Sequence, residues 1–460
     1  MRTLRSLNCG RFVHGISVLF TGTLISSVCS FVTQLVLTHS LTVAEFGRIA
    51  ALLAAINLVT PLASAGVNWS LLQAFGREGW GAVRWLRPSA MLVGIATCLA
   101  SLIVAGYALR ADIGGTGVGT LVLVTSIPIL VGQVAVELAS CRFQLEGRYE
   151  RLATWQTTMQ TGRLAAAAGV ALAVPLAAYD GVLVGFAIVG ALTGSAGGLL
   201  LRDLSAGRIE LAGHPAPPPE GARPLEVPSL RDTAAEAAPF ALMTIFYLLY
   251  FQGGVILLEW LCGGSAAAIY NAAFLLIAAI FLIPNVIYMR LLVAPLCRWA
   301  EHDRDSFAAA LHAGVPAMAI LGTLIAVATA LAAAPLVPLL FGAQYAPAVP
   351  VLQILAVGIP IRFVQSAYSS LFVSKENMVR KVKYLSVSAA VGIAASLWLI
   401  PRFGAAGAAV ATTAAEAILL GLHIYGTQAV IPGFSVFDTI RVARVRSAVR
   451  HLAQHSRLGA

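Results

Sequence analysis

Twelve long apolar stretches, separated by short polar connections, constrain the fold of this chain more than any other feature. A helix needs about 20 mostly apolar residues to cross the roughly 30 Å hydrocarbon core of a bilayer. The stretches reach that length in a chain that is 59% hydrophobic and only 11% charged. The sequence therefore predicts an all-α membrane protein with about 12 transmembrane helices. We place these helices at approximately 16–38, 46–66, 88–108, 117–139, 160–178, 182–201, 234–258, 266–289, 309–334, 348–373, 382–400 and 405–428.

Basic residues fall on every second connection between these stretches. The N-terminus, the C-terminal tail and the connections on the same side hold most of the 30 lysines and arginines, whereas the opposite connections hold only Arg48, Arg110 and Arg402. Because cytoplasmic loops retain Lys and Arg, the basic side is predicted to face the cytoplasm, and both termini with it. Topology therefore accounts for the net charge of +10, and we expect no nucleic-acid partner.

The clearest break in the apolar pattern lies at residues 202–233. This stretch contains four prolines between Pro215 and Pro219, a composition typical of an extended, polyproline-like linker. After Pro432, valines and arginines follow the spacing of an amphipathic helix on the inner leaflet. We therefore predict an N-lobe of six helices at 1–201, a cytoplasmic linker at 202–233, a C-lobe of six helices at 234–431 and a basic amphipathic tail at 432–460.

Motifs of enzymes and of cofactor sites are missing from the sequence. There is no Walker loop, no HExxH and no GxSxG, and the six cysteines are scattered without a CxxC pair. The connections predicted to face outward are short, so they offer no domain for a catalytic site. We expect no catalytic residue, no cofactor and no metal site, and we expect the chain not to be an enzyme.

Charged residues inside the predicted helices are the strongest functional signal. A charge at membrane depth is costly and usually faces a cavity or a partner. Arg362 and Glu416 have apolar turns on both sides, so a structural ion pair, either with each other or with another helix, competes evenly with a role in a cavity. The other candidates have a further alternative, since they can reach the nearest interface by snorkelling. These are Arg48, Glu137, Arg163 and Glu236.

The guanidinium group of arginine matches phosphate oxygens, which favours a substrate with a diphosphate head. A lipophilic cation would instead call for exposed carboxylates, which are few here. The candidate residues for the diphosphate are Arg48, Arg163 and Arg362. Glu416 and Glu236 are candidate coupling sites or charge partners. Candidate polar residues of the cavity, each of which could instead form an interhelical hydrogen bond, are Gln34, Asn57, Gln252 and Asn271.

Several segments resemble a known family of transporters. The segment Pro335–Pro360, with Phe341, Gly342 and Tyr345, and the segment from Leu397 to Glu416 resemble bacterial polysaccharide flippases of the O-antigen and exopolysaccharide type. That family belongs to the multidrug/oligosaccharidyl-lipid/polysaccharide exporter superfamily. The segments Glu45–Ala50 and Tyr270–Ala273 resemble the paired helix openings of the same family.

This resemblance implies two six-helix lobes around a central cavity, in a bacterial inner membrane. It also implies alternating access for an undecaprenyl-diphosphate-linked oligosaccharide during polysaccharide biosynthesis. The expected partners are this substrate, membrane lipid, and the polymerase and glycosyltransferases of polysaccharide assembly. Two alternatives stay open, namely a drug/cation antiporter of the same superfamily and a non-transporting component of a polysaccharide assembly complex. A glycan polymerase or ligase would need a large outer loop, which this sequence does not offer.

Overall fold

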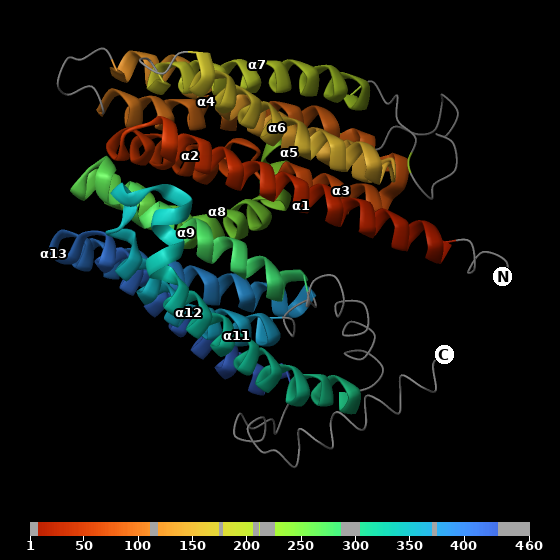
Figure 1. Cartoon of the computed structure of the whole chain (residues 1–460). Helices are drawn as coiled ribbons and strands as arrows, with labels where there is room; N and C mark the ends of the chain where they lie inside the picture. Colours follow the sequence, from red (N-terminus) through yellow and green to blue (C-terminus); the bar gives the residue numbers. More distant parts are fainter. Residues whose placement is uncertain are drawn as a thin grey trace. The chain divides into compact units, whose positions relative to one another are not determined.

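A computed structural model of the chain describes residues 8–110, 118–173, 178–205, 211, 226–286, 304–369 and 375–430 (Figure 1). Within these ranges every regular element is a helix, which confirms the prediction of an all-α membrane protein. The short elements are α3 (Val67–Glu78) and the 3-10 helices η1 (Gly79–Trp85) and η4 (Ala343–Tyr345). The long helices are α1 (Asn8–Ser40), α2 (Val43–Ala63), α4 (Leu86–Arg110), α5 (Val118–Leu145), α6 (Tyr149–Ala173), α7 (Ala178–Ser205), α8 (Leu230–Cys262), α9 (Gly264–Val286), α11 (Arg304–Phe341), α12 (Ala348–Ser369) and α13 (Lys375–Val430).

Nine stretches of the described residues are long and apolar enough to cross a membrane. Two of them are too long for a single crossing. Val43–Leu109 contains α2 and α4 with α3 and η1 between them, and Val379–Gln428 is broken at Gly404, whose φ of 56° is not helical. The polar helix α6 is not among the nine. The predicted number of twelve crossings therefore stays a prediction.

The chain forms two compact units. The N-terminal unit comprises Met1–Glu45 and Leu52–Leu248, and the C-terminal unit comprises Phe46–Ala51 and Leu249–Ala460. The predicted boundaries of the two lobes stay a prediction. Most of the predicted linker at 202–233 and the predicted tail at 432–460 lie outside the described residues.

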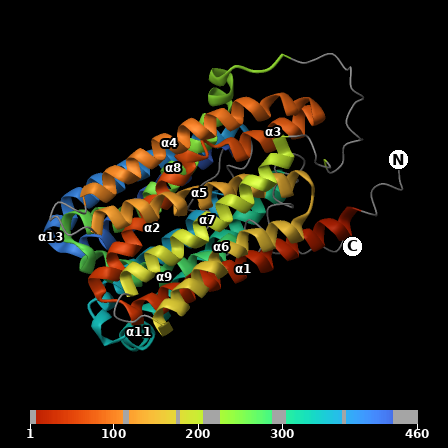
Figure 2. The same cartoon turned by 90° about the horizontal axis from the view of Figure 1, so that it is seen from above.

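Close helix contacts in the N-terminal unit depend on small residues. α1 and α6 run side by side in the same direction, with Ser26 bonded to Thr157 at 3.0 Å and Gly22 against Ala153 (Figure 2). α5 packs on α7, and a Cβ on Gly190 would lie only 2.5 Å from the carbonyl oxygen of Pro128. Small residues let helix backbones approach in this way, and such packing drives helix association in lipid.

The connection from α2 to α3 is a tight left-handed turn. Ala65 and Gly66 have φ values of 49° and 69°, so the chain leaves the helical conformation for two residues. A Cβ on Gly66 would lie 2.6 Å from both the carbonyl oxygen of Ala237 and the amide nitrogen of Ala241. Gly66 therefore allows the backbone of α8 to pack directly on this turn.

The centre of the C-terminal unit is α12, which packs on α9, α11 and α13. A buried aromatic cluster joins distant parts of the sequence in this unit. The ring centroids of Phe46 and Phe341 each lie 6.0 Å from that of Tyr345, and all three side chains are fully buried. Two of the segments that carry the family resemblance, Glu45–Ala50 and Pro335–Pro360, thus meet in one core.

Candidate functional site

Arg362 of α12 and Glu416 of α13 form a buried ion pair in the C-terminal unit. Nη1 of Arg362 lies 3.5 Å from Oε1 of Glu416, and the carboxylate side chain is only 2% exposed. The hydroxyl of Tyr250 on α8 lies beside the same carboxylate. An ion pair was one of the two predictions for these residues, and it forms. It joins two helices through residues that are 54 positions apart in the sequence.

Aromatic rings cover the guanidinium group of Arg362. Its Cζ lies 5.1 Å from the ring centre of Phe251 on α8 and 5.5 Å from that of Phe281 on α9. Phe274 contacts Phe251 edge to face and stacks on Tyr270, whose hydroxyl bonds to Thr412 on α13 at 2.9 Å. Cation–π contacts of this kind strengthen when water is excluded. We call Arg362, Glu416, Phe251 and Phe281 the arginine cage.

More positive charge lies near the arginine cage than negative charge. Lys381 and His423, both on α13, lie within electrostatic range of Arg362 and of each other. His423 is 1% exposed and meets Tyr384 edge to face. Among the described residues, Glu416 is the carboxylate that pairs with Arg362 in this cluster. The arrangement would attract an anion that can reach Arg362 and Lys381.

Arg163 of α6 is a buried arginine of the N-terminal unit. It is 7% exposed, and its guanidinium group lies 5.6 Å from the ring centre of Phe186 on α7. Its Nε and Nη2 atoms are buried and have no hydrogen-bond partner among the described residues. A buried charged donor without a partner is expensive, so Arg163 is a strong candidate for binding an anionic ligand.

Asn57 of α2 takes part in an interhelical hydrogen-bond chain. Its Oδ1 accepts from Nε2 of Gln133 on α5 at 2.9 Å, and Oε1 of Gln133 accepts from the Thr60 hydroxyl at 2.7 Å. The interhelical hydrogen bond that the sequence left open as an alternative for Asn57 is therefore present. The role of Asn57 in lining a cavity stays a prediction.

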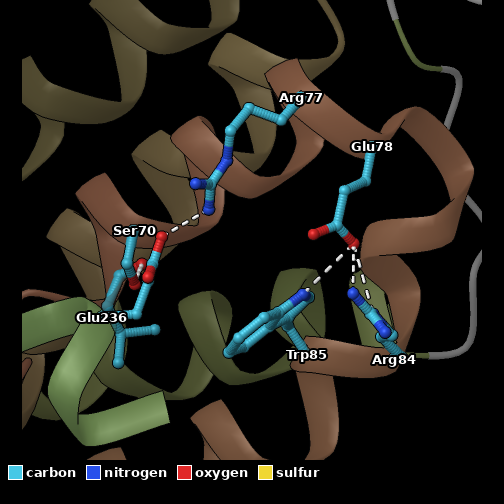
Figure 3. A network of polar contacts seen from close by, with 7 residues as sticks. Ser70, Arg77, Glu78, Arg84, Trp85 and Glu236 are labelled. Carbon is cyan, nitrogen blue, oxygen red and sulfur yellow. Dashed lines mark hydrogen bonds and ion pairs between the residues drawn. The ribbon is translucent and has the colours of Figure 1, made fainter. Parts of the chain in front are cut away.

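Glu236 lies in a polar network at the start of α8, within the N-terminal unit. Its carboxylate pairs with Arg77 of α3, while Glu78 accepts from Arg84 at 3.0 Å and from Trp85 at 3.4 Å (Figure 3). The Arg77 and Glu236 side chains are 47% and 32% exposed, which limits the worth of this pair to stability. Glu236 thus serves here as a partner of Arg77 and not of a buried arginine.

The structure places the remaining candidates in less informative surroundings. Arg48 is exposed, and Asn271 is half-buried. Gln34 and Gln252 are half-buried too, but the Oε1 atom of each is buried and has no hydrogen-bond partner in the described part of the chain. Such acceptors suit a polar ligand or water. The assignment of all four residues to a substrate cavity stays a prediction.

Sequence reasoning missed the aromatic and basic neighbours of Arg362. Phe251, Phe281, Lys381 and His423 come from three different helices, so no local spacing connects them. Aromatic residues in an apolar helix usually belong to the core, and this is why the cage could not be inferred from the residues alone.

Comparison with known proteins decides the family. A sequence profile of the family described as "Polysaccharide biosynthesis protein" matches residues 12–293, which is more than half of the chain. The chain belongs to this family. No sequence among curated proteins gives a significant match to the chain.

Solved transporter structures share the fold. The chain is similar to "Lipid II flippase MurJ, inward closed conformation", with a TM-score of 0.68, 10% identity and coverage of 94% of this chain and 90% of the other. It is also similar to an inward-facing multidrug resistance MATE family transporter of the MOP superfamily. The TM-score is 0.62 and the identity 11%, with coverage of 90% of this chain and 98% of the other. A third similar structure is that of the Vibrio cholerae MATE transporter VcmN. The TM-score is 0.56 and the identity 16%, with coverage of 94% of this chain and 100% of the other. The chain thus shares its fold with a lipid II flippase and with MATE transporters.

Proposed function

We propose that this protein is a flippase that moves undecaprenyl-diphosphate-linked oligosaccharide repeat units across the bacterial inner membrane by alternating access. The observation that carries the proposal is the pair of positive charges on Arg362 and Lys381, which has Glu416 as its carboxylate partner. Membership of a polysaccharide biosynthesis family and the fold shared with a lipid II flippase support the choice of a lipid-linked saccharide.

Arg163 and Arg362 give the diphosphate head a chemical reason to enter the protein. Arg163 has free donors for phosphate oxygens. Arg362 is held by one carboxylate at 3.5 Å, so a diphosphate can compete with Glu416 for the same guanidinium group. Glu416, once displaced, would be free to bind a proton or another cation, which makes it the proposed coupling site. Arg48 is a further proposed contact for the head group.

The membrane potential favours the proposed direction. With both termini and the basic connections in the cytoplasm, an inside-negative potential drives an anion outward by about 2.3 kcal/mol per charge per 100 mV. The oligosaccharide would travel with its head group through the protein, while the polyprenyl tail stays on the lipid-facing side. In this role the protein works beside the glycosyltransferases that build the repeat unit and the polymerase that joins the units, and it is not itself an enzyme.

A test in cells replaces the central arginine. Arg362→Ala should stop transport, so lipid-linked oligosaccharide should accumulate on the cytoplasmic side while polymer output falls. The matched control is Arg402→Ala, because the Arg402 guanidinium also lies over an aromatic ring, Trp398 at 4.5 Å, but is exposed. Normal polymer output from Arg362→Ala at a normal protein level would contradict the proposal.

A drug/cation antiporter is the second candidate. It is favoured by the fold shared with MATE transporters and by a buried carboxylate, Glu416, beside aromatic rings, a setting that also suits a lipophilic cation. In this structure the cation among those rings is Arg362 itself. Growth of cells in toxic lipophilic cations, with and without the gene, separates the two functions. Resistance that depends on Glu416 and leaves polymer output unchanged would favour the antiporter.

A further inference from the structure

An apolar groove runs between α4, α5 and α7 of the N-terminal unit. Its volume is about 690 Å³, and its lining is almost entirely apolar and carries no charged residue. α4 supplies residues from Val93 to Leu102, α5 from Val131 to Leu138, and α7 from Gly194 to Leu201. At 1.5 Å per residue these segments extend about 10–14 Å along their helices. None of the functions assigned above uses this groove.

Glycines keep the groove open. A Cβ on Gly94 of α4 or on Gly198 of α7 would meet no atom within 4 Å, although both residues line the groove. The same face of α4 continues in exposed apolar side chains, with Leu99 57% and Leu102 68% exposed. In a membrane protein such a surface contacts hydrocarbon, since water in an apolar groove at that depth makes few hydrogen bonds. A hydrocarbon chain is therefore the chemistry that fits the groove.

One end of the groove has an arginine on each of the three helices, and two of these arginines, Arg87 and Arg202, are exposed. Arg87 precedes Val93 by six residues, or about 9 Å along α4. Arg142 follows Leu138 by four residues, and Arg202 directly follows Leu201. Arg142 is bound to Leu200 at 2.6 Å and to Asp203 at 3.2 Å, whereas Arg87 and Arg202 are exposed. A hydrocarbon chain below an anionic head would match both the groove and its end.

We propose that this groove holds the polyprenyl tail of the lipid-linked substrate, with the diphosphate near Arg87 and Arg202. The inference rests on the proposed function. It selects a polyprenyl diphosphate over a phospholipid for two reasons. A polyprenyl chain carries methyl branches and is wider than a straight acyl chain, and Gly94 and Gly198 supply that width. The three helices also form one open groove, which suits a lipid with one tail. The basic end is the end predicted to face the cytoplasm, where the substrate is loaded.

Photo-crosslinking tests the groove directly. The purified protein is placed in phosphatidylcholine nanodiscs with a polyprenyl diphosphate that carries a photoreactive group on its first isoprene units. Crosslinks should map to the groove segments of α4, α5 and α7. Unlabelled undecaprenyl diphosphate should compete for them, and an equal amount of phosphatidylglycerol should not. Crosslinks elsewhere, or equal competition by phosphatidylglycerol, would overturn the inference and in the latter case indicate an ordinary lipid site.

Two substitutions fill the groove without a clash inside the protein. Gly94→Leu and Gly198→Leu each place a side chain in open space, and each should reduce crosslinking by about tenfold or more. Gly106→Leu is the matched control, because Gly106 lies on the same helix as Gly94, also has nothing within 4 Å and does not line the groove. Equal crosslinking in Gly94→Leu and Gly106→Leu would count against the groove.

A second measurement needs no substitution in the groove. Cys98 is exposed and lines the groove, whereas Cys262 is exposed on α8 outside it. Undecaprenyl diphosphate should slow alkylation of Cys98 by a lipid-soluble maleimide and leave Cys262 unchanged. Equal rates at Cys98 with and without this lipid would overturn the inference.

Transport assays on the same samples separate the two proposals. Wild-type protein that translocates the lipid-linked oligosaccharide but shows no groove crosslinks would overturn the groove and keep the flippase. Groove crosslinks with competition, in a protein that translocates no oligosaccharide lipid, would overturn the flippase and keep the groove as a polyprenyl diphosphate site.

Discussion

Arg163 and Arg362 both lie in predicted membrane helices, but their surroundings are opposite. Arg362 has the Glu416 carboxylate at 3.5 Å and two aromatic rings over its guanidinium group. Arg163 has one ring, and two of its nitrogen atoms have no partner among the described residues. The first arginine is compensated by the protein, whereas the second is not. This difference predicts opposite effects on stability.

Replacing Arg163 with Met should stabilise the protein and abolish transport. The substitution removes an unsatisfied buried charge, whose cost is about 1–3 kcal/mol for a donor without a partner. Arg362→Met should lower stability by about 3–5 kcal/mol, because it leaves the Glu416 carboxylate buried without its cation. Thermal unfolding in detergent checks the predicted rise in stability for Arg163→Met and the predicted fall for Arg362→Met. Transport is measured on the same variants.

Two controls sharpen this comparison. The double variant Arg362→Met, Glu416→Leu should recover most of the lost stability, since replacing a whole buried pair by apolar residues is often neutral. Arg402→Met should change little, because Arg402 is exposed. A lower unfolding temperature for Arg163→Met would mean that Arg163 has a structural partner, and the account of a free anion site would be wrong.

For single residues, the sequence predicted which charged side chains lie inside the membrane helices. It predicted their contact partners less well. Apolar turns on both sides of Arg362 and Glu416 were enough to mark them as buried, and the pair was one of two stated possibilities. The separation of Glu236 from these residues was not predictable. Its partner Arg77 lies on α3, a helix that the apolar pattern did not contain.

Among the elements, the turn between α2 and α3 should be the most sensitive in stability to one added Cβ atom. Gly66→Ala adds a Cβ where φ is 69° and where two backbone atoms of α8 lie at 2.6 Å. Strain and displacement together should cost about 1–3 kcal/mol of unfolding free energy. Thermal unfolding of the purified variant measures the loss.

Gly76→Ala is the control on the neighbouring helix. Gly76 lies in α3, is exposed and has nothing within 4 Å of its Cβ position. The change should be neutral or stabilise by up to about 1 kcal/mol, since alanine favours the helix. Equal destabilisation by the two substitutions would show that the close approach of α8 to Gly66 is not specific.

The sequence predicted the long helices well because a bilayer imposes their length and apolar character. The predicted stretch 46–66 corresponds to α2 (Val43–Ala63), and 88–108 corresponds to α4 (Leu86–Arg110). Two polar elements escaped this pattern. α3 with η1 was taken as a connection, and α6 begins at Tyr149 where the prediction began at 160. Threonines and glutamines in the first turns of α6 interrupt the apolar pattern by which a membrane helix is recognised. The threonine hydroxyls there donate to carbonyl oxygens of the same helix.

On the scale of the whole molecule, the two candidate arginines belong to different units. Arg163 belongs to the N-terminal unit and Arg362 to the C-terminal unit. Transporters with two bundles commonly alternate access by moving one bundle against the other around a central site. In the proposed flippase, one anionic head would be attracted by both units in turn. We therefore expect transport to need both arginines, with neither able to replace the other.

Reconstitution of the purified protein into liposomes tests the central claim most directly. The liposomes contain a radiolabelled undecaprenyl-diphosphate-linked oligosaccharide, and an enzyme added outside reports how much of the sugar faces outward under an imposed inside-negative potential. The account predicts rapid outward transfer, favoured at equilibrium by about fifty-fold per negative charge per 100 mV, and lost in Arg362→Ala. Folded wild-type protein that leaves the oligosaccharide distributed as in protein-free liposomes would contradict the account.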